Sequence, residues 1–344
     1  MKILHVSNFV QKDNGRLFWN TPFRISNGFT RLGHNVLNFS VRDIARENIF
    51  NSTKFGKSKL NERLLTTCIN YNPDLIVLGH ADLVSIDTLD EIRFKIKKLK
   101  IINWNVDHLL MNDTLNKIKY FSKVVDSTFV TTGDKIIAGL SNHKMNISFI
   151  PNIFDNSIDS LKIFENEHYE YDIFFAMSHG VGSGVLKKNK SDGREKLLLH
   201  IDNQDNINTN FFGFNNIQPI WGNKFYQEII KAPMGLNLSQ GETLKLYSSD
   251  RLSSYIGNGL LTFLDAKYDF QSLYTDEEVV FYETKEELVD KISFYSVNSD
   301  SRRKIAFNGW LKSHKNFNGV NICEYMLNKV FDNKTNNYWQ EISY

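Results

Sequence analysis

Short apolar runs alternate with amphipathic segments along the first half of the chain, and the pattern resumes after a polar interruption. Apolar strands separated by helical stretches are typical of βαβ units with a parallel sheet. The first series of predicted strands covers residues 3–6, 36–41, 74–78, 100–104, 128–131 and 147–150. The second covers residues 172–177, 210–214, 235–238, 260–264 and 278–282. We therefore expect two doubly wound, Rossmann-like α/β domains facing a central cleft, where such sheets bind ligands.

The domain boundary is predicted where the apolar pattern breaks. The break lies near Pro151 and Asn152, and a polar, acidic segment follows before the second series begins at Tyr171. We expect an N-terminal domain over 1–152 and a C-terminal domain over 153–318. A last helix and tail, 319–344, are expected to pack back on the N-terminal domain.

Several helix ends carry recognisable signals. Thr21 is expected to be an N-cap, with Pro22 at the first helical position, and Gly33 is expected to stop that helix. Thr284 followed by Glu287 has the spacing of a capping box. Further helices are predicted to start near residue 299 and to span 320–331.

Composition and charge narrow the class of protein. The 344 residues are 41% hydrophobic and 13% aromatic, enough to fill two cores. A net charge of only +2 argues against a dedicated nucleic-acid binder, so we expect no nucleic-acid partner. Basic runs at 95–100 and 187–190 are either contacts with an anionic membrane surface or solvated faces.

The two cysteines, Cys68 and Cys323, lie too far apart in sequence for a disulfide framework or a zinc motif. Both are expected to be small buried hydrophobic residues. The chain shows neither the apolar stretch of a signal peptide nor a run of about 20 apolar residues able to span a bilayer. We therefore expect a cytoplasmic protein, with peripheral contact with the inner membrane left open.

The segment 247–265 combines a polar helix start with a basic residue. Ser248, Ser249 or Asp250 can cap the backbone N–H groups there, and Arg251 adds a positive charge. Asn258-Gly259 is expected to end the helix, because both residue types tolerate the left-handed conformation. The helix start suits a phosphate, although an ordinary capped helix explains the same residues.

A glycine-rich loop follows the first strand of the second series. Ser178 opens it, and Gly180 and Gly182 would let backbone N–H groups approach a phosphate closely. Arg194 then places a cation near the start of the next helix. The glycine spacing does not match a dinucleotide-binding fingerprint, so a nicotinamide or flavin enzyme is not expected. A flexible turn and a surface arginine are the alternative interpretations.

The order of these blocks resembles a known family. Residues 172–317 resemble the C-terminal half of two-domain GT-B glycosyltransferases, in the group-1 branch that includes the spore-maturation-protein type. The matching blocks are DIFFAMSHGVGSG, FFGFN, WGNKFYQEIIKAPMGLNLS, SSDRLSSYIGNGLLTFLD, EEVVFYETKEELVDKISFY and RRKIAFNGWLKSHKNF. A looser resemblance in the N-terminal half is carried by KIINWNVDH, STFVTTGD and ISFIPNIFD.

The resemblance implies a glycosyltransferase whose second domain holds a nucleotide-sugar donor. Its diphosphate would lie against the 178–184 loop and the 248–251 helix start, and its base near 213–221. The donor-binding residues implied or suggested in this way are Gly15, Ser178, Gly180, Gly182, Arg194, Trp221, Tyr247, Ser248, Ser249, Arg251 and Ser254. The chain contains no Asp-x-Asp pair, so we expect neither a metal nor any cofactor besides the UDP-, GDP- or CMP-linked donor.

The acceptor is expected to be a saccharide, a lipid-linked glycan or a protein hydroxyl, in cell-surface polysaccharide synthesis. Asp107 and His80 follow neighbouring predicted strands of the first domain. Either side chain could act as the general base for an acceptor hydroxyl, or Asp107 could steady charge on the sugar. The alternative for each is a polar loop residue without a catalytic role.

One position departs from the family pattern. Many relatives carry a glutamate in the cleft helix that holds donor hydroxyls, and here that position is Ser254. A serine hydroxyl bonds a sugar less strongly than a carboxylate. The departure leaves room for an unusual donor such as a CMP-linked acid sugar, for a catalytically silent GT-B-like binding or assembly module, and for a nucleotide-sugar epimerase.

Overall fold

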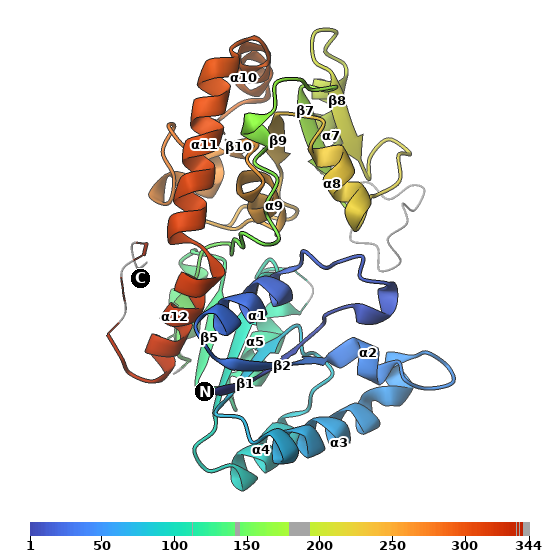
Figure 1. The fold of residues 1–344 in the computed structure, drawn as a ribbon, viewed down its shortest axis with the longest axis vertical. Helices are drawn as coiled ribbons and strands as arrows, with labels where there is room; N and C mark the ends of the chain where they lie inside the picture. Colours follow the sequence, from blue (N-terminus) through green and yellow to red (C-terminus); the bar gives the residue numbers. More distant parts are fainter. Residues whose placement is uncertain (112, 142–144, 179–192, 335, 337, 340–344) are drawn as a thin grey trace. The chain divides into compact units, whose positions relative to one another are not determined.

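The computed structural model describes residues 1–111, 113–141, 145–178, 193–334, 336, 338 and 339. The chain divides into two compact units. One comprises Met1–Ile153 together with Asn318–Tyr344, and the other is Phe154–Phe317. Each unit is built on one parallel sheet with helices on its faces (Figure 1). The expected fold class, two Rossmann-like α/β domains, is therefore confirmed.

The N-terminal sheet has six strands in the order β2-β1-β3-β4-β5-β6. The strands are β1 (Lys2–Ser7), β2 (Asn35–Ser40), β3 (Leu75–Gly79), β4 (Lys100–Asn105), β5 (Ser127–Val130) and β6 (Ile147–Phe149). All neighbouring pairs are parallel. The central strand β3 is buried along its whole length, as expected of a sheet covered on both faces.

Helices cover both faces of this sheet. They are α1 (Thr21–Arg31), α2 (Val41–Ala45), α3 (Thr53–Tyr71), α4 (Ile86–Lys95), α5 (Thr114–Phe121), α6 (Ile136–Ser141) and α12 (Gly319–Val330). One core cluster contains side chains from α2, α3, α4 and α5 together with Leu4 and Val6 of β1. On the opposite face α12 lies against α1, where a Cβ on Gly28 would stand 2.2 Å from the carbonyl oxygen of Gly319. That close approach requires glycine.

The C-terminal sheet has five strands in the order β11-β10-β9-β7-β8. They are β7 (Ile173–Ala176), β8 (Thr209–Phe212), β9 (Met234–Asn237), β10 (Leu261–Asp265) and β11 (Val280–Tyr282). The helices α7 (Glu195–Asp202), α10 (Lys285–Val297) and α11 (Ser299–Asn316) share one core cluster with the sheet. A second cluster joins α8 (Asn223–Ile229) and α9 (Arg251–Gly257) to the sheet.

Local signals gave mixed results at helix ends. The expected N-cap at Thr21 is wrong, because Asn20 is the N-cap and its side chain accepts from the Thr21 backbone N–H, so Thr21 is the first helical residue. The hydroxyl of Thr284 does cap α10, accepting from the Glu287 backbone N–H at 3.1 Å as predicted. Both cysteines are buried and free, as expected.

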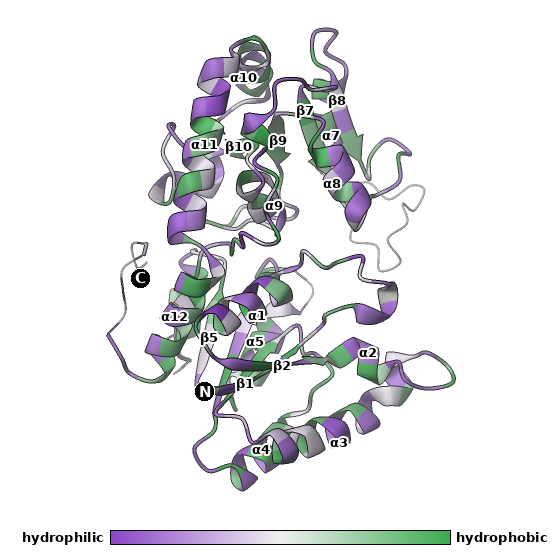
Figure 2. Ribbon diagram, viewed as in Figure 1, coloured by the Kyte–Doolittle hydropathy of each residue, from purple (hydrophilic) through white to green (hydrophobic). Residues whose placement is uncertain are grey.

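The helices mix polar and apolar residues along their length (Figure 2). Among the described residues, no helix is both long enough and apolar enough to cross a membrane.

Candidate functional site

The C-terminal sheet forks between β7 and β9. The chain leaves β7 for β8 on one side and then crosses to β9 on the other, which makes this the topological switch point of the sheet. The β7–β9 pairing covers only Ile173 with Met234 and Phe174 with Gly235. Beyond these pairs the carboxyl ends of the two strands present backbone groups that the ladder does not bond.

Two side chains of α9 fill this fork. The Nε of Arg251 donates to the carbonyl oxygen of Ala176 at 3.0 Å, and its Nη1 donates to that of Leu238 at 2.7 Å. The Ala176 backbone N–H donates to the Tyr255 hydroxyl at 3.1 Å. Arg251 and Tyr255 are four residues apart and so share one helix face. Together they clamp the ends of β7 and β9.

The clamp changes how Arg251 is understood. Arg251 of α9 contacts the end of β7 at Ala176, two residues before Ser178. Its guanidinium donates to the two backbone carbonyl oxygens and, at 3.2 Å, to the Ser249 Oγ. The guanidinium carbon also lies 4.8 Å from the centroid of the Phe175 ring. Arg251 therefore holds the fork together and also fixes a positive charge at the carboxyl edge of the sheet.

The expected capping of α9 by Asp250 is wrong. The N-cap residue Asp250 has helical dihedral angles and makes no side-chain capping bond, and the Ser248 hydroxyl donates to Asn237 Oδ1 at 3.1 Å. At the other end only Gly259, with φ of +84°, takes the left-handed conformation. Asn258 has φ of −91° and instead donates its side-chain amide to the Ser254 carbonyl oxygen.

The position of the family glutamate is buried. Ser254 is 2% exposed, and its hydroxyl donates to the Asp250 carbonyl oxygen one turn back at 3.3 Å. Tyr247 is also buried, and its carbonyl oxygen accepts from the Ser239 hydroxyl. In the structure, Ser254 and Tyr247 therefore form hydrogen bonds with nearby residues of the same domain.

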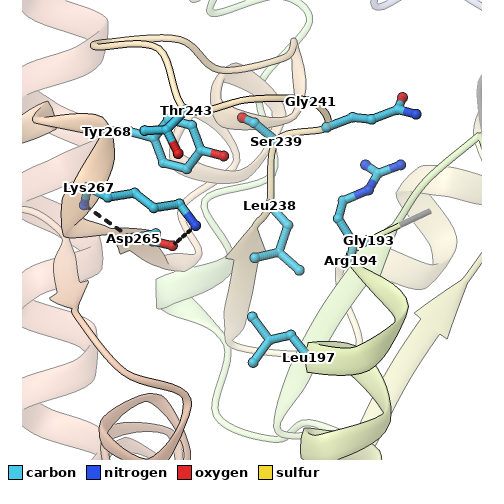
Figure 3. A pocket seen from close by; sticks show the side chains of 11 residues that line it. Gly193, Arg194, Leu197, Leu238, Ser239, Gly241, Thr243, Asp265, Lys267 and Tyr268 are labelled. Carbon is cyan, nitrogen blue, oxygen red and sulfur yellow. Dashed lines mark hydrogen bonds and ion pairs between the residues drawn. The ribbon is translucent and has the colours of Figure 1, made fainter.

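A cavity of about 320 Å³ opens beside the fork, at the carboxyl ends of β9 and β10 and the start of α7 (Figure 3). Figure 3 shows Arg194 and Lys267 on opposite sides of it, with Leu197 and Leu238 between them. Lys267 is paired with Asp265 at 2.6 Å. The remaining lining residues are Gly193, Ser239, Gln240, Gly241, Thr243 and Tyr268.

The cavity and the fork are neighbours. Leu238 lines the cavity and its carbonyl oxygen accepts from Arg251. Burial raises the pKa of Tyr255 to about 12, while the charges of Arg251 and Arg194 act in the opposite direction. Both arginines are therefore close enough to act electrostatically on the same phenol. Arg194, Lys267 and Asp265 together give the cavity wall a net charge of +1, and this positive charge, the hydroxyls and a short apolar floor make the edge suitable for a phosphorylated ligand.

The residues Asp265, Lys267, Ser239 and Thr243 were not singled out from the sequence. A usable signal was present, because Asp265 and Lys267 directly follow a predicted strand and therefore belong at the ligand-binding edge of a parallel sheet.

The structure brings the two predicted catalytic residues together in the N-terminal unit. His80 follows β3 and Asp107 follows the adjacent β4, and His80 Nδ1 lies 3.4 Å from Asp107 Oδ2. The imidazole is 28% exposed and the carboxylate 56%. Loss of solvent raises the pKa of Asp107, but His80, Lys117 and Arg42 outweigh that effect and hold the pKa below its usual value.

A buried polar network supports this pair. His80 adopts φ of +49° and packs edge-on against the Trp104 ring, with centroids 5.2 Å apart. A Cβ on Gly79 would lie 1.9 Å from the same indole, so glycine is required there. Trp104 Nε1 donates to His5 Nε2 at 3.1 Å, which leaves His5 Nδ1 to donate to the Ser26 hydroxyl at 2.8 Å. The role of His5 was not predicted from the sequence.

The other predicted site residues are less informative. Gly15 has φ of +71° with no atom within 4 Å of an added Cβ, so its backbone conformation, and not a close approach, calls for glycine. Trp221 lies just before α8 and is partly buried. Gly180 and Gly182 lie outside the described residues. Within the described residues, no three or more metal-ligating side chains gather to form a metal site.

Comparison with known proteins finds one family and many similar folds. Residues 193–328 match the family described as glycosyl transferase-like. A solved trehalose-6-phosphate synthase is 9% identical, with a TM-score of 0.57 over 98% of this chain and all of that one. The β-glucosyltransferase of T4 phage, solved with its UDP-glucose substrate, is 13% identical, with a TM-score of 0.54 over 96% of this chain and all of that one.

A UDP-N-acetylglucosamine 2-epimerase is 10% identical, with a TM-score of 0.52 over 95% of this chain and 96% of that one. A search of curated proteins finds no match. At these identities the structural likeness shows the fold alone, and none of the matches distinguishes the spore-maturation branch, which stays a prediction. The chain thus has the two-domain GT-B fold, and its residues 193–328 carry the pattern of the glycosyl transferase-like family.

Proposed function

We propose that the chain is a glycosyltransferase that moves a sugar from a nucleotide-sugar donor to an acceptor hydroxyl. The observation that carries this proposal is the cationic cavity at the carboxyl edge of the C-terminal sheet, where Arg194 and Lys267 lie next to the fork held by Arg251. The family match over 193–328 covers this edge from α7 onward and supports the same function.

The donor's phosphate would lie near Arg194 and Lys267, with the charge of Arg251 behind it. When the bond between the anomeric carbon and the phosphate oxygen breaks, the electron pair leaves with the nucleotide. Fixed cations stabilise that negative charge without reorganising during the reaction. The donor is a UDP-, GDP- or CMP-linked sugar.

His80 and Asp107 would serve the acceptor side. The acceptor oxygen forms the new bond to the anomeric carbon and passes its proton to the imidazole of His80. Asp107 is ionised at neutral pH, because its pKa is lowered, and its negative charge stabilises the imidazolium that results. The acceptor is a saccharide, a lipid-linked glycan or a protein hydroxyl, in the synthesis of a cell-surface polysaccharide.

The first experiment is a binding screen followed by a transfer assay. Ligands that bind the folded state raise its apparent stability by mass action, so thermal unfolding with UDP, GDP, CMP and their sugars identifies the base. The selected donor is then incubated with candidate acceptors, and the products are analysed by mass spectrometry. Absence of stabilisation by every nucleotide would contradict the proposal.

Two other functions share this architecture. The buried, helix-bonded hydroxyl of Ser254 favours a binding module without catalysis, and an epimerase has the same fold. An epimerase converts the donor with no acceptor present, and a silent module binds it without any turnover. Formation of a glycosylated acceptor only when both substrates are supplied would exclude both.

A further inference from the structure

An exposed apolar tip stands on the N-terminal unit, in the loop between α2 and α3. Ile49 is 95% exposed and Phe50 is 68% exposed, and Phe55 in the first turn of α3 is 64% exposed. The rings of Phe50 and Phe55 are in contact, with centroids 5.2 Å apart. In Figure 1 this loop extends beyond the ends of α2 and α3, and part of it is strongly apolar in Figure 2.

The apolar tip has a basic surround. Residues 46–63 contain five lysine or arginine residues and two glutamates, a net charge of +3. Arg63 is paired with Glu47 at 2.5 Å. Lys54, Lys57 and Lys59 are exposed, and no ion pair of theirs occurs among the described residues. Large apolar side chains next to unpaired lysines form a surface that suits a partner offering both an apolar region and negative charge.

We propose that this tip, defined by Ile49, Phe50 and Phe55, docks on an anionic phospholipid surface. The three apolar side chains enter the boundary between headgroups and acyl chains, and the three lysines contact the phosphates above them. Apolar side chains with such high exposure are costly in water and gain free energy in that boundary. Unpaired lysines select a negatively charged surface over a neutral one.

The charge pattern decides between this occupant and a second copy of the chain. In a symmetric dimer formed through the tip, the segment 46–63 of each copy, with its net charge of +3, would face the same positive segment of the other copy. An anionic bilayer removes that repulsion. The proposal does not depend on the catalytic proposal, because it concerns a different surface of the protein.

The test measures flotation of the full-length chain with lipid vesicles. Vesicles of phosphatidylcholine mixed with phosphatidylglycerol should carry the protein, and vesicles of phosphatidylcholine alone should not. The Ile49→Ser/Phe50→Ser variant should bind at least about tenfold more weakly, because two exposed apolar side chains no longer enter the boundary. The Lys54→Gln/Lys57→Gln/Lys59→Gln variant should lose about 100-fold, at roughly fivefold per lysine.

Matched controls come from the C-terminal unit. Val297 and Phe294 are 79% and 53% exposed, so Phe294→Ser/Val297→Ser removes similar apolar surface. Lys196, Lys285 and Lys304 are also exposed, so their glutamine substitutions remove the same charge. Both control variants should float like the original chain, and all variants should keep its circular dichroism and melting temperature.

Three results would overturn the proposal. The first is that the original chain does not float with anionic vesicles, and the second is that the control variants lose as much binding as the tip variants. The third is a lipid-free dimer, detected by light scattering, that the tip substitutions convert to a monomer, since that would assign the tip to a second copy.

Discussion

Arg251 and Ala176 lie 75 residues apart in sequence, and the guanidinium of one donates to the carbonyl oxygen of the other at 3.0 Å. This bond lies where β7 separates from β9, at the switch point of the C-terminal sheet. An arginine that holds two strand ends together keeps its charge fixed at the edge where ligands of parallel sheets bind. The Arg251 side chain therefore both stabilises the ends of the two strands and supplies positive charge to the candidate site.

Arg251→Ala should lower the free energy of unfolding by about 2 kcal/mol or more, because it removes charged hydrogen bonds to two backbone carbonyls. It should also weaken donor binding by roughly 1.5–3 kcal/mol. Urea unfolding and calorimetry measure the two effects. Ser254→Ala is the control on the same helix and should cost less than about 1 kcal/mol, since it removes only a bond within the helix.

Arg251→Lys separates charge from geometry. A lysine keeps the positive charge but lacks the planar fork that reaches both carbonyls. We expect stability to fall while UDP binding is partly retained. If Arg251→Ala instead leaves both the unfolding curve and nucleotide binding unchanged, the clamp has no energetic role.

Arg194→Ala should weaken binding of the nucleoside diphosphate by about tenfold or more, because it removes a cation from the cavity wall. The neutral nucleoside should bind equally well to the variant and to the original chain. Calorimetry with both ligands makes this comparison, and Lys196→Ala on the same helix is the matched control. An equal loss for nucleoside and diphosphate would show that Arg194 does not contact a phosphate.

Transfer activity should persist in the presence of EDTA. The absence of an Asp-x-Asp pair predicts this, and the proposed site supplies its positive charge from Arg194, Lys267 and Arg251. The assay compares initial rates after dialysis against EDTA with rates after added Mg²⁺ or Mn²⁺. A rate that is lost on chelation and restored by either ion would make the enzyme metal-dependent.

The strands were predictable to within two residues because most of them are short apolar runs. Such runs arise where both faces of a parallel sheet are covered by helices. A strand such as β3 is then buried on both faces, so every position in it is apolar and its limits are visible in the sequence. The helix ends were harder. Thr21 and Asn20 are both competent caps, and the local sequence does not rank them.

The site was predictable only where chemistry follows directly from strand order. His80 and Asp107 end adjacent strands, so the sheet itself brings them together. The roles of Ser248 and Arg251 depend on partners supplied by β7 and β9, which no local rule contains. The family resemblance predicts that Ser254 faces a ligand, yet a serine in a helix has a competing acceptor one turn back.

His80→Gln should reduce kcat by about 10²–10⁴ if the imidazole takes the acceptor proton. Asp107→Asn should reduce kcat and also lower the pKa of His80, because the negative charge that favours the imidazolium is removed. The acid limb of the pH–rate profile should then move to lower pH. Asp113→Asn, on the same loop, is the control for a surface carboxylate, and an unchanged profile in Asp107→Asn would rule out the pair.

The buried His5 should make the protein sensitive to mild acid. Complete burial lowers the pKa of His5 from 6.5 to about 3. Between these two values the unfolded chain binds a proton that the native state does not, so stability is full above pH 6.5 and falls as the pH decreases. The contribution of this one group is about 1.4 kcal/mol per pH unit.

His5→Gln removes the titrating group and keeps an amide able to hydrogen-bond. The variant should be less stable at neutral pH, because the bonds to Trp104 and Ser26 are disturbed, but its stability should fall less steeply on acidification. Urea unfolding of both proteins from about pH 8 to about pH 5 gives the two slopes. Equal slopes would mean that His5 is protonated in the native state, and the Trp104 Nε1 bond to its Nε2 would then be wrong.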